Sequence, residues 1–271
     1  MLSTVQATNR LQLLRLGEEH SQRPYFLFLP GMDGNGKLIQ PQIPNLQPYF
    51  EIRALSIPPD SQLSWSDLTT TVAELVMTEC SDREIYICGE SFGGCLALRL
   101  ASQYPHLAQR LIVVNCASAF RRRLWLEWGN NLVKLLAVPL FQVATYGLLP
   151  FLAGGDRVDE PERQALVAAM QAVTPSSASW RIRLLMEFDL AQVGLNHLVI
   201  PTLLIASQRD RLLPSGEEAR RLQRHISQAQ ILDLPVSGHT CLLEKPINLS
   251  ALLRQVEFLP SKRVEVSAYS R

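Results

Sequence analysis

The sequence predicts an α/β fold in which a mainly parallel sheet is covered by helices on both faces. Apolar runs of strand length alternate with helix-length periodic stretches along most of the 271 residues. The alternation stops between residues 119 and 197, where the apolar periodicity is helical throughout. Hydrophobic residues make up 47% of the chain, which is enough for a sizeable core. We therefore expect one core, formed by residues 1–118 and 198–271, with a helical cap or lid inserted at 119–197.

Seven short apolar runs are the expected strands, at residues 11–16, 25–29, 52–56, 85–88, 111–115, 202–206 and 231–234. Four periodic stretches outside the insertion are the expected helices, at residues 67–79, 92–103, 216–225 and 247–258. Ser66 and Asp67 are the expected start of the first helix. Ser215 places a hydroxyl at the start of the third, followed by two acidic residues. The insertion divides into helical stretches at 125–153, 156–172 and 176–190.

The charge balance excludes an overall field that would attract a polyanion, because 26 basic and 25 acidic side chains give a net charge of +1. We expect no nucleic-acid partner. The arginine run 121–123 is typical of a solvated helix end, with a basic recognition surface as the alternative. The five cysteines include no CxxC pair and lie mostly in apolar runs, which indicates reduced thiols in a cytoplasmic protein. The first residues lack the apolar core of a secretory signal.

Residues 135–155 form a run of 21 residues without a charge, long enough to cross a bilayer. Pro139 and Pro150 would break a helix there. Gln142 and Thr145 would place polar groups in lipid. The pattern favours a lid that contacts a membrane peripherally, with a spanning helix as the alternative.

The motif Gly89-Glu90-Ser91-Phe92-Gly93 indicates a catalytic serine. It follows the strand expected at 85–88 and precedes the helix expected at 92–103. A nucleophile in this setting lies on a sharp turn, where the two flanking glycines avoid collisions. The helix behind Ser91 also directs backbone N–H groups towards a developing oxyanion. The alternative is a chance G-x-S-x-G sequence in an ordinary tight turn.

A serine nucleophile needs a base and an acid that orients the base. His239 directly follows the last expected strand, where this arrangement places its base. Asp210 lies in the loop after the strand at 202–206, at the sheet edge where active-site groups gather. Asp233 is the rival acid, but it lies inside the final strand, close in sequence to His239. The remaining histidines are expected to be surface or structural residues: His20, His106, His197 and His225.

The glycine-rich segment 29–36 is the expected second half of an oxyanion hole. The backbone N–H of Met32 would act there with that of Phe92. The order Gly31-x-x-Gly34-x-Gly36 is the reverse of a dinucleotide fingerprint, so a nucleotide is not expected. No pair of metal-ligating residues has the spacing of a helix-borne site, and we expect neither a metal nor another cofactor.

Large apolar side chains are concentrated in the first part of the insertion. They are candidates for lining a path for a greasy substrate, with Trp125, Trp128, Leu140 and Phe141 as the expected substrate-binding residues. The alternative is that they only pack the lid onto the core.

Four blocks together resemble the α/β-hydrolase part of the phytyl ester synthase/diacylglycerol acyltransferase-like proteins of plastids and cyanobacteria. The blocks are residues 29–36, 89–94, 207–215 and 238–239, in the same order. The resemblance implies an α/β-hydrolase fold and a long-chain acyl or prenyl-type lipid substrate. The plastid proteins continue into a second, acyltransferase-like domain that has no counterpart in these 271 residues.

The expected activity is hydrolysis of a carboxylic ester or thioester through an acyl-enzyme on Ser91. The expected partner is a small-molecule or lipid ester. An alcohol such as phytol or diacylglycerol could accept the acyl group instead of water, which would make the same site an acyltransferase. A non-catalytic binding module with this fold is the third alternative.

Overall fold

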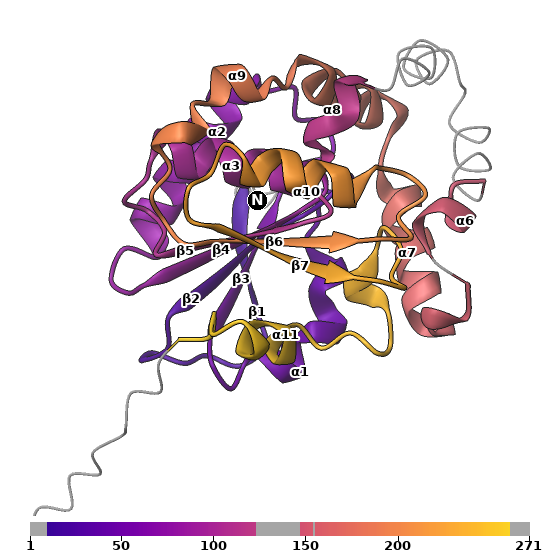
Figure 1. The fold of residues 1–271 in the computed structure, drawn as a ribbon, viewed down its shortest axis with the longest axis horizontal. Coiled ribbons are helices and arrows are strands. Elements are labelled where there is room, and N and C mark those ends of the chain that lie inside the picture. Colours follow the sequence, from indigo (N-terminus) through magenta and orange to yellow (C-terminus); the bar gives the residue numbers. More distant parts are fainter. Residues whose placement is uncertain (1–9, 123–146, 154, 261–271) are drawn as a thin grey trace, which may run out of the picture.

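The computed structural model describes residues 10–122, 147–153 and 155–260 (Figure 1). Its centre is a seven-stranded sheet of order β1-β3-β2-β4-β5-β6-β7. The strands are β1 (Gln12–Leu16), β2 (Tyr25–Leu29), β3 (Glu51–Ser56), β4 (Ile85–Glu90), β5 (Arg110–Val114), β6 (Thr202–Ser207) and β7 (Ala229–Leu234). Only the β1–β3 pair among them is antiparallel. All seven expected strands are present, so the predicted α/β architecture is confirmed.

The central strands are apolar along their whole length because both faces of the sheet are covered. Every residue of β2, β4 and β6 is buried. Alternate residues of β2 enter different cores: Leu27 and Leu29 pack on one side, Phe26 and Phe28 on the other. Figure 1 shows the helices α2 (Trp65–Glu79), α3 (Phe92–Gln103) and α10 (Ser215–Gln223) on one side of the sheet. The helices α1 (Ile43–Leu46) and α11 (Leu249–Gln255) cover the opposite side.

Two expected helix caps are corrected by the structure. Helix α2 begins at Trp65 and is capped by Ser64, whose hydroxyl accepts a hydrogen bond from the Asp67 N–H, so Ser66 is not the cap. Helix α10 has no side-chain cap, because Ser215 is its first residue and the preceding residue is Pro214, which has no side-chain acceptor; the Ser215 hydroxyl donates to Asp210. The acidic residues expected in its first turn, Glu217 and Glu218, are there.

The described part of residues 119–197 contains helices and no strand. Its α-helices are α6 (Leu149–Leu152), α7 (Glu160–Ala172), α8 (Pro175–Glu187) and α9 (Leu190–Val193). Over the whole described chain, the 3-10 helices are Lys37–Gln42, Ala117–Arg122, Gly155–Arg157, Leu195–His197 and Cys241–Leu243. The proposed substrate-binding residues Trp125, Trp128, Leu140 and Phe141 lie outside the described residues.

Helix α8 is fixed to the core by two tryptophans. The indole N–H of Trp65, on α2, donates to the Leu184 carbonyl at 2.6 Å. The indole N–H of Trp180, on α8, donates to the Leu63 carbonyl at 2.8 Å. Trp180 itself is buried, so this helix is docked by both packing and hydrogen bonds.

No helix among the described residues has the length and apolar character needed to cross a bilayer. Most of the uncharged run 135–155 lies outside them.

Candidate active site

Ser91 occupies a strained turn between β4 and α3. Its backbone has φ 54° and ψ −110°, a positive φ that costs a non-glycine residue about 1–3 kcal/mol. A Cβ on Gly89 would lie 2.2 Å from the Gly93 carbonyl oxygen, and one on Gly93 would lie 2.0 Å from the Leu29 carbonyl oxygen. Both glycines of the motif are therefore required by the close approach of backbone segments. The turn presents the Ser91 hydroxyl at the carboxyl edge of the sheet.

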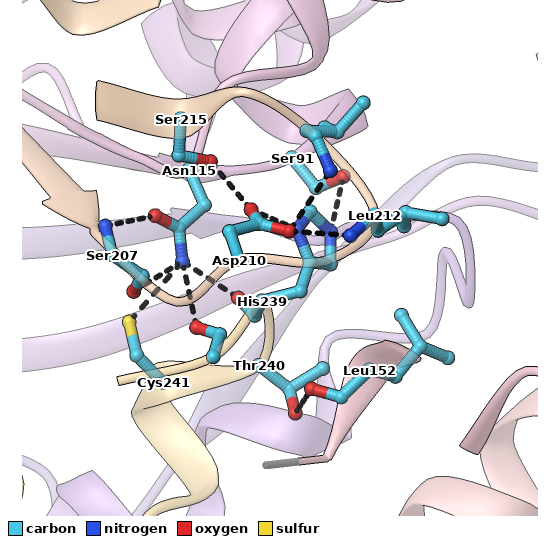
Figure 2. Close-up of polar contacts among 12 residues, drawn as sticks. Ser91, Asn115, Leu152, Ser207, Asp210, Leu212, Ser215, His239, Thr240 and Cys241 are labelled. Atoms are coloured by element: carbon cyan, nitrogen blue, oxygen red, sulfur yellow. Dashed lines mark hydrogen bonds and ion pairs between the residues drawn. The ribbon is translucent and has the colours of Figure 1, made fainter. Parts of the chain in front are cut away.

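Three side chains from three different loops meet at this edge (Figure 2). The Ser91 Oγ lies 3.1 Å from the His239 Nε2, and the His239 Nδ1 lies 2.7 Å from the Asp210 Oδ2. Ser91 follows β4, Asp210 follows β6 and His239 follows β7. Ser91 is 7% exposed and His239 4%, so the chain of hydrogen bonds is shielded from water. The structure thus brings together the serine, the histidine and the acid that the sequence singles out.

Asp210 is held by more groups than His239 alone. Its Oδ1 accepts hydrogen bonds from the N–H groups of Leu212 and Leu213, both at 2.9 Å, and its Oδ2 accepts from the Ser215 hydroxyl. Burial alone would raise the pKa of Asp210, but the charge of His239 and these hydrogen bonds lower it below its ordinary value. The carboxylate is therefore ionised and fixed in orientation, as a residue that positions an imidazole must be.

The charge of His239 is affected by two acidic residues, Asp210 and Glu90. Burial alone would lower the pKa of His239, but Asp210 and, to a smaller extent, Glu90 raise it above its ordinary value. Glu90 is itself buried, and burial raises its pKa to about 7, against the opposing effect of His239. Nothing in the motif's spacing distinguishes this residue, which is the variable position before the serine.

The rival acid and the other histidines lie elsewhere. The Asp233 carboxylate is 45% exposed, accepts a hydrogen bond from Gln208 and faces Arg220 at 4.0 Å. The three histidines at 106, 197 and 225 are exposed. His20 lies in the turn before β2, where its backbone N–H donates to Glu51 at 2.6 Å. Among the described residues, no hydrogen bond or ion pair joins any of these four histidines to Ser91.

The glycine-rich loop after β2 lies directly beside Ser91. A Cβ on Gly31 would be 3.7 Å from the Ser91 Cβ, which places Met32 next to the nucleophile on this side. Phe92 is on the other side as the first residue of α3, where backbone N–H groups have no partner within the helix. The Phe92 ring stacks on Trp65 at 5.1 Å between ring centroids, which fixes the start of α3.

Asn115 belongs to the site, although its position in the sequence predicts only the end of a strand. Its side-chain amide donates to the His239 carbonyl at 2.7 Å and to the Ser207 Oγ at 2.9 Å, and its Oδ1 accepts from the Ser207 N–H at 2.8 Å (Figure 2). Asn115 is 1% exposed and has a positive φ of 44°. It joins the ends of β5 and β6 to the histidine loop. The only sequence signal for this role is that Asn115 is a polar residue directly after a buried apolar strand.

Within the described residues, no group of three or more His, Cys, Asp or Glu side chains could hold a metal ion. All five cysteines are buried and free, as predicted.

Comparisons with known proteins agree with this geometry. A family model described as serine aminopeptidase, S33, matches residues 57–246. The chain is 28% identical over 264 residues to phytyl ester synthase 1, chloroplastic, of Arabidopsis thaliana, covering 88% of this chain and 37% of that protein. It is 32% identical over 170 residues to the pimeloyl-[acyl-carrier protein] methyl ester esterase of Nitrosomonas europaea, and this match covers 59% of this chain and 66% of that protein.

The chain therefore spans less than two fifths of the length of this phytyl ester synthase. Among solved structures, an α/β-hydrolase enzyme from a Medee basin deep-sea metagenome library matches with a TM-score of 0.75 and 19% identity. That match covers 94% of this chain and 97% of the other. The likeness shows that the fold is the expected α/β-hydrolase fold.

Proposed function

Because the chain belongs to the hydrolase family described as serine aminopeptidase, S33, of the α/β-hydrolase superfamily, we propose that it hydrolyses carboxylic esters through an acyl-enzyme on Ser91. The observation that carries this proposal is the continuous hydrogen-bonded chain from Ser91 through His239 to Asp210. An ester substrate is favoured because the relatives described above are named as an ester synthase and a methyl ester esterase.

In the proposed reaction, the Ser91 Oγ attacks the ester carbonyl carbon while the His239 Nε2 takes the hydroxyl proton. The negative charge that develops on the carbonyl oxygen is stabilised by the backbone N–H groups of Met32 and Phe92. When the tetrahedral intermediate collapses, the C–O bond to the alcohol breaks and His239 gives its proton to the departing oxygen. Water then attacks the acyl-enzyme by the same route, which releases the acid and restores Ser91. Asp210 keeps the proton on the His239 Nδ1 throughout.

For the substrate, we propose a lipid-like acyl ester that enters beneath a cap formed by residues 119–197. The proposal is supported by the similarity to the phytyl ester synthase and by the uncharged run at 135–155. Trp125, Trp128, Leu140 and Phe141 are the proposed contacts with the acyl chain, on the basis of the sequence pattern alone. Peripheral contact of this cap with a membrane is part of the same proposal.

A second candidate function is transfer of the acyl group to an alcohol. It is favoured by the 28% identity to the phytyl ester synthase across 88% of this chain. The acyl-enzyme is common to both reactions, so the outcome depends on whether water or an alcohol reaches it. Adding phytol to the reaction distinguishes them, because a transferase forms the phytyl ester at the expense of the free acid.

The test of the proposed function is the Ser91→Ala substitution, measured as release of p-nitrophenol from short p-nitrophenyl esters. Loss of a triad member costs several orders of magnitude in rate, so the variant is expected to lose about 10³-fold or more in kcat. The exposed residue Ser176 provides the control Ser176→Ala, which should keep full activity. Circular dichroism verifies that both variants fold. Undiminished turnover in a folded Ser91→Ala protein would overturn the proposal.

A further inference from the structure

Helix α8 carries a buried arginine whose charge the proposed reaction does not use. Arg181 is 1% exposed, and burial lowers its pKa to about 10 against the opposing effect of Asp33. Transferring a guanidinium from water to a protein interior is costly unless it gains strong partners there. Whether burial of Arg181 is stable therefore depends on the groups that its guanidinium contacts.

The hydrogen bond and the steric contact of the Arg181 head group lie in the glycine-rich loop beside Ser91, and its guanidinium also lies 5.7 Å from the centroid of the Trp180 ring. The Arg181 Nη1 donates to the Met32 carbonyl oxygen. The guanidinium also fills the space above Gly34, where a Cβ would lie 2.2 Å from its Nη2. Asp33, between these two residues, provides the opposite charge, and its carboxylate accepts a hydrogen bond from the Asn35 N–H at 3.0 Å. One side chain from α8 thus donates a hydrogen bond to Met32, packs against Gly34 and interacts with the charge of Asp33.

We propose that Arg181 is a positioning residue that holds the loop so that the Met32 N–H faces the substrate carbonyl oxygen. This inference rests on the proposed function. The Met32 carbonyl and the Met32 N–H belong to adjacent peptide units that meet at the Met32 Cα, so anchoring the carbonyl, together with the packing of the guanidinium on Gly34, limits where the loop can place the N–H. A donor that is already oriented stabilises the oxyanion without reorganising during the reaction. Loss of the guanidinium leaves the N–H present but free to turn away.

Helix α8 supports the other half of the site through a separate contact. Its Leu184 carbonyl accepts from the Trp65 indole, and the Trp65 ring stacks on Phe92. Trp180 provides an additional hydrogen bond to the core. Because these contacts do not involve Arg181, α8 is expected to stay docked when that side chain is replaced.

The experiment compares Arg181→Met with the control Arg183→Met on the same helix. Arg183 is 53% exposed and only approaches Glu187, at 3.9 Å. Misplacing one oxyanion donor should lower kcat of Arg181→Met about 10- to 100-fold, while KM changes by less than about threefold. Phenylboronic acid forms a tetrahedral adduct with an active serine, so its inhibition constant should rise in parallel with the loss in kcat/KM. Arg183→Met should match the wild type in all three quantities.

A second pair of substitutions tests the contact itself. Gly34→Ala strains the backbone at φ +67° in any background, but it collides with the guanidinium only when Arg181 is present. Its effect on kcat should therefore be larger in the wild type than in Arg181→Lys, which keeps the charge but loses the planar fork. Arg181→Lys also replaces Arg181→Met if the latter does not fold, with an expected loss in kcat of about tenfold.

Wild-type kcat and unchanged boronic acid affinity in either folded Arg181 variant would overturn the inference. Equal effects of Gly34→Ala in both backgrounds would also contradict it. If Ser91→Ala instead retains turnover, the proposed function itself fails, so the two failures are distinguishable.

Discussion

Two acidic residues, Asp210 and Glu90, act on His239 in different ways. Asp210 accepts its Nδ1 hydrogen bond, whereas Glu90 has no hydrogen bond to it among those described and acts through its charge. A negative charge near an imidazole favours the protonated form, which cannot act as a base. Glu90 therefore adds, to a smaller extent than Asp210, to the pKa below which His239 is no longer available to accept the Ser91 proton.

Substituting Glu90→Gln should move the acidic limb of the pH profile of kcat/KM to lower pH. The amide removes the charge that raises the pKa of His239, so the neutral imidazole persists in more acidic solution. The profile is measured with a p-nitrophenyl ester followed at its pH-independent absorbance. Glu160→Gln, at an exposed position on α7, is the control and should leave the profile unchanged. A limb that stays in place, or moves to higher pH, would show that Glu90 does not act on His239.

For single residues, the sequence predicts a role where that role follows from the neighbouring residues in the chain. Ser91, Asp210 and His239 each lie in a short segment just after an apolar strand, and that position can be read from the chain. Arg181 and Asn115 could not be assigned in this way. Their contacts join residues 149 and 124 positions apart, to Met32 and His239, and no short motif records such a distance.

The elements of the site are held together where strands end. Asn115, at the end of β5, bonds both to Ser207 at the end of β6 and to the backbone of His239 after β7. These hydrogen bonds are buried, where each is stronger than in water and costly to leave unmade. The spacing between the acid loop and the histidine loop therefore depends on one amide side chain.

Replacing Asn115 with glycine tests this arrangement without adding backbone strain. Glycine adopts the positive φ of 44° freely, so Asn115→Gly removes the amide and little else. We expect kcat to fall about tenfold or more, because a displaced base costs rate even when it is present. The Asn196→Gly variant, at an exposed position, controls for an added glycine.

The conservative variant Asn115→Asp separates positioning from packing. It keeps the acceptor for the Ser207 N–H but loses the donor to the His239 carbonyl. It should therefore also lose activity. Full kcat in both folded variants would mean that Asn115 is only structural.

Element boundaries show where local patterns were insufficient. Ser215 has the residue type of a helix cap, but it is the first residue of α10, after Pro214, and its hydroxyl donates to Asp210. Ser64 caps α2, one residue before the helix begins, whereas Ser66 lies inside it. Both errors arise because each helix begins one or two residues earlier than its sequence pattern indicates, and local patterns do not fix a helix start more closely than that.

At the scale of the whole molecule, the sheet was the most predictable feature. Three fully buried strands read as continuous apolar runs, and the parallel order places their carboxyl ends along one edge. The order of the strands within the sheet, with β3 between β1 and β2, is not visible in the sequence because it depends on pairing between distant segments. The same topology gathers Ser91, Asp210 and His239 although 148 positions separate the first from the last.

The most direct test of an acyl-enzyme on Ser91 is covalent labelling with a fluorophosphonate, followed by digestion and mass spectrometry of the peptides. The reagent phosphonylates a serine only where a base and an oxyanion pocket activate it. The account predicts one labelled peptide containing Ser91, rapid labelling of Asp233→Asn and loss of labelling in Asp210→Asn by about 10²-fold or more in rate. Label on another residue, or none in a protein that still turns over p-nitrophenyl esters, would contradict it.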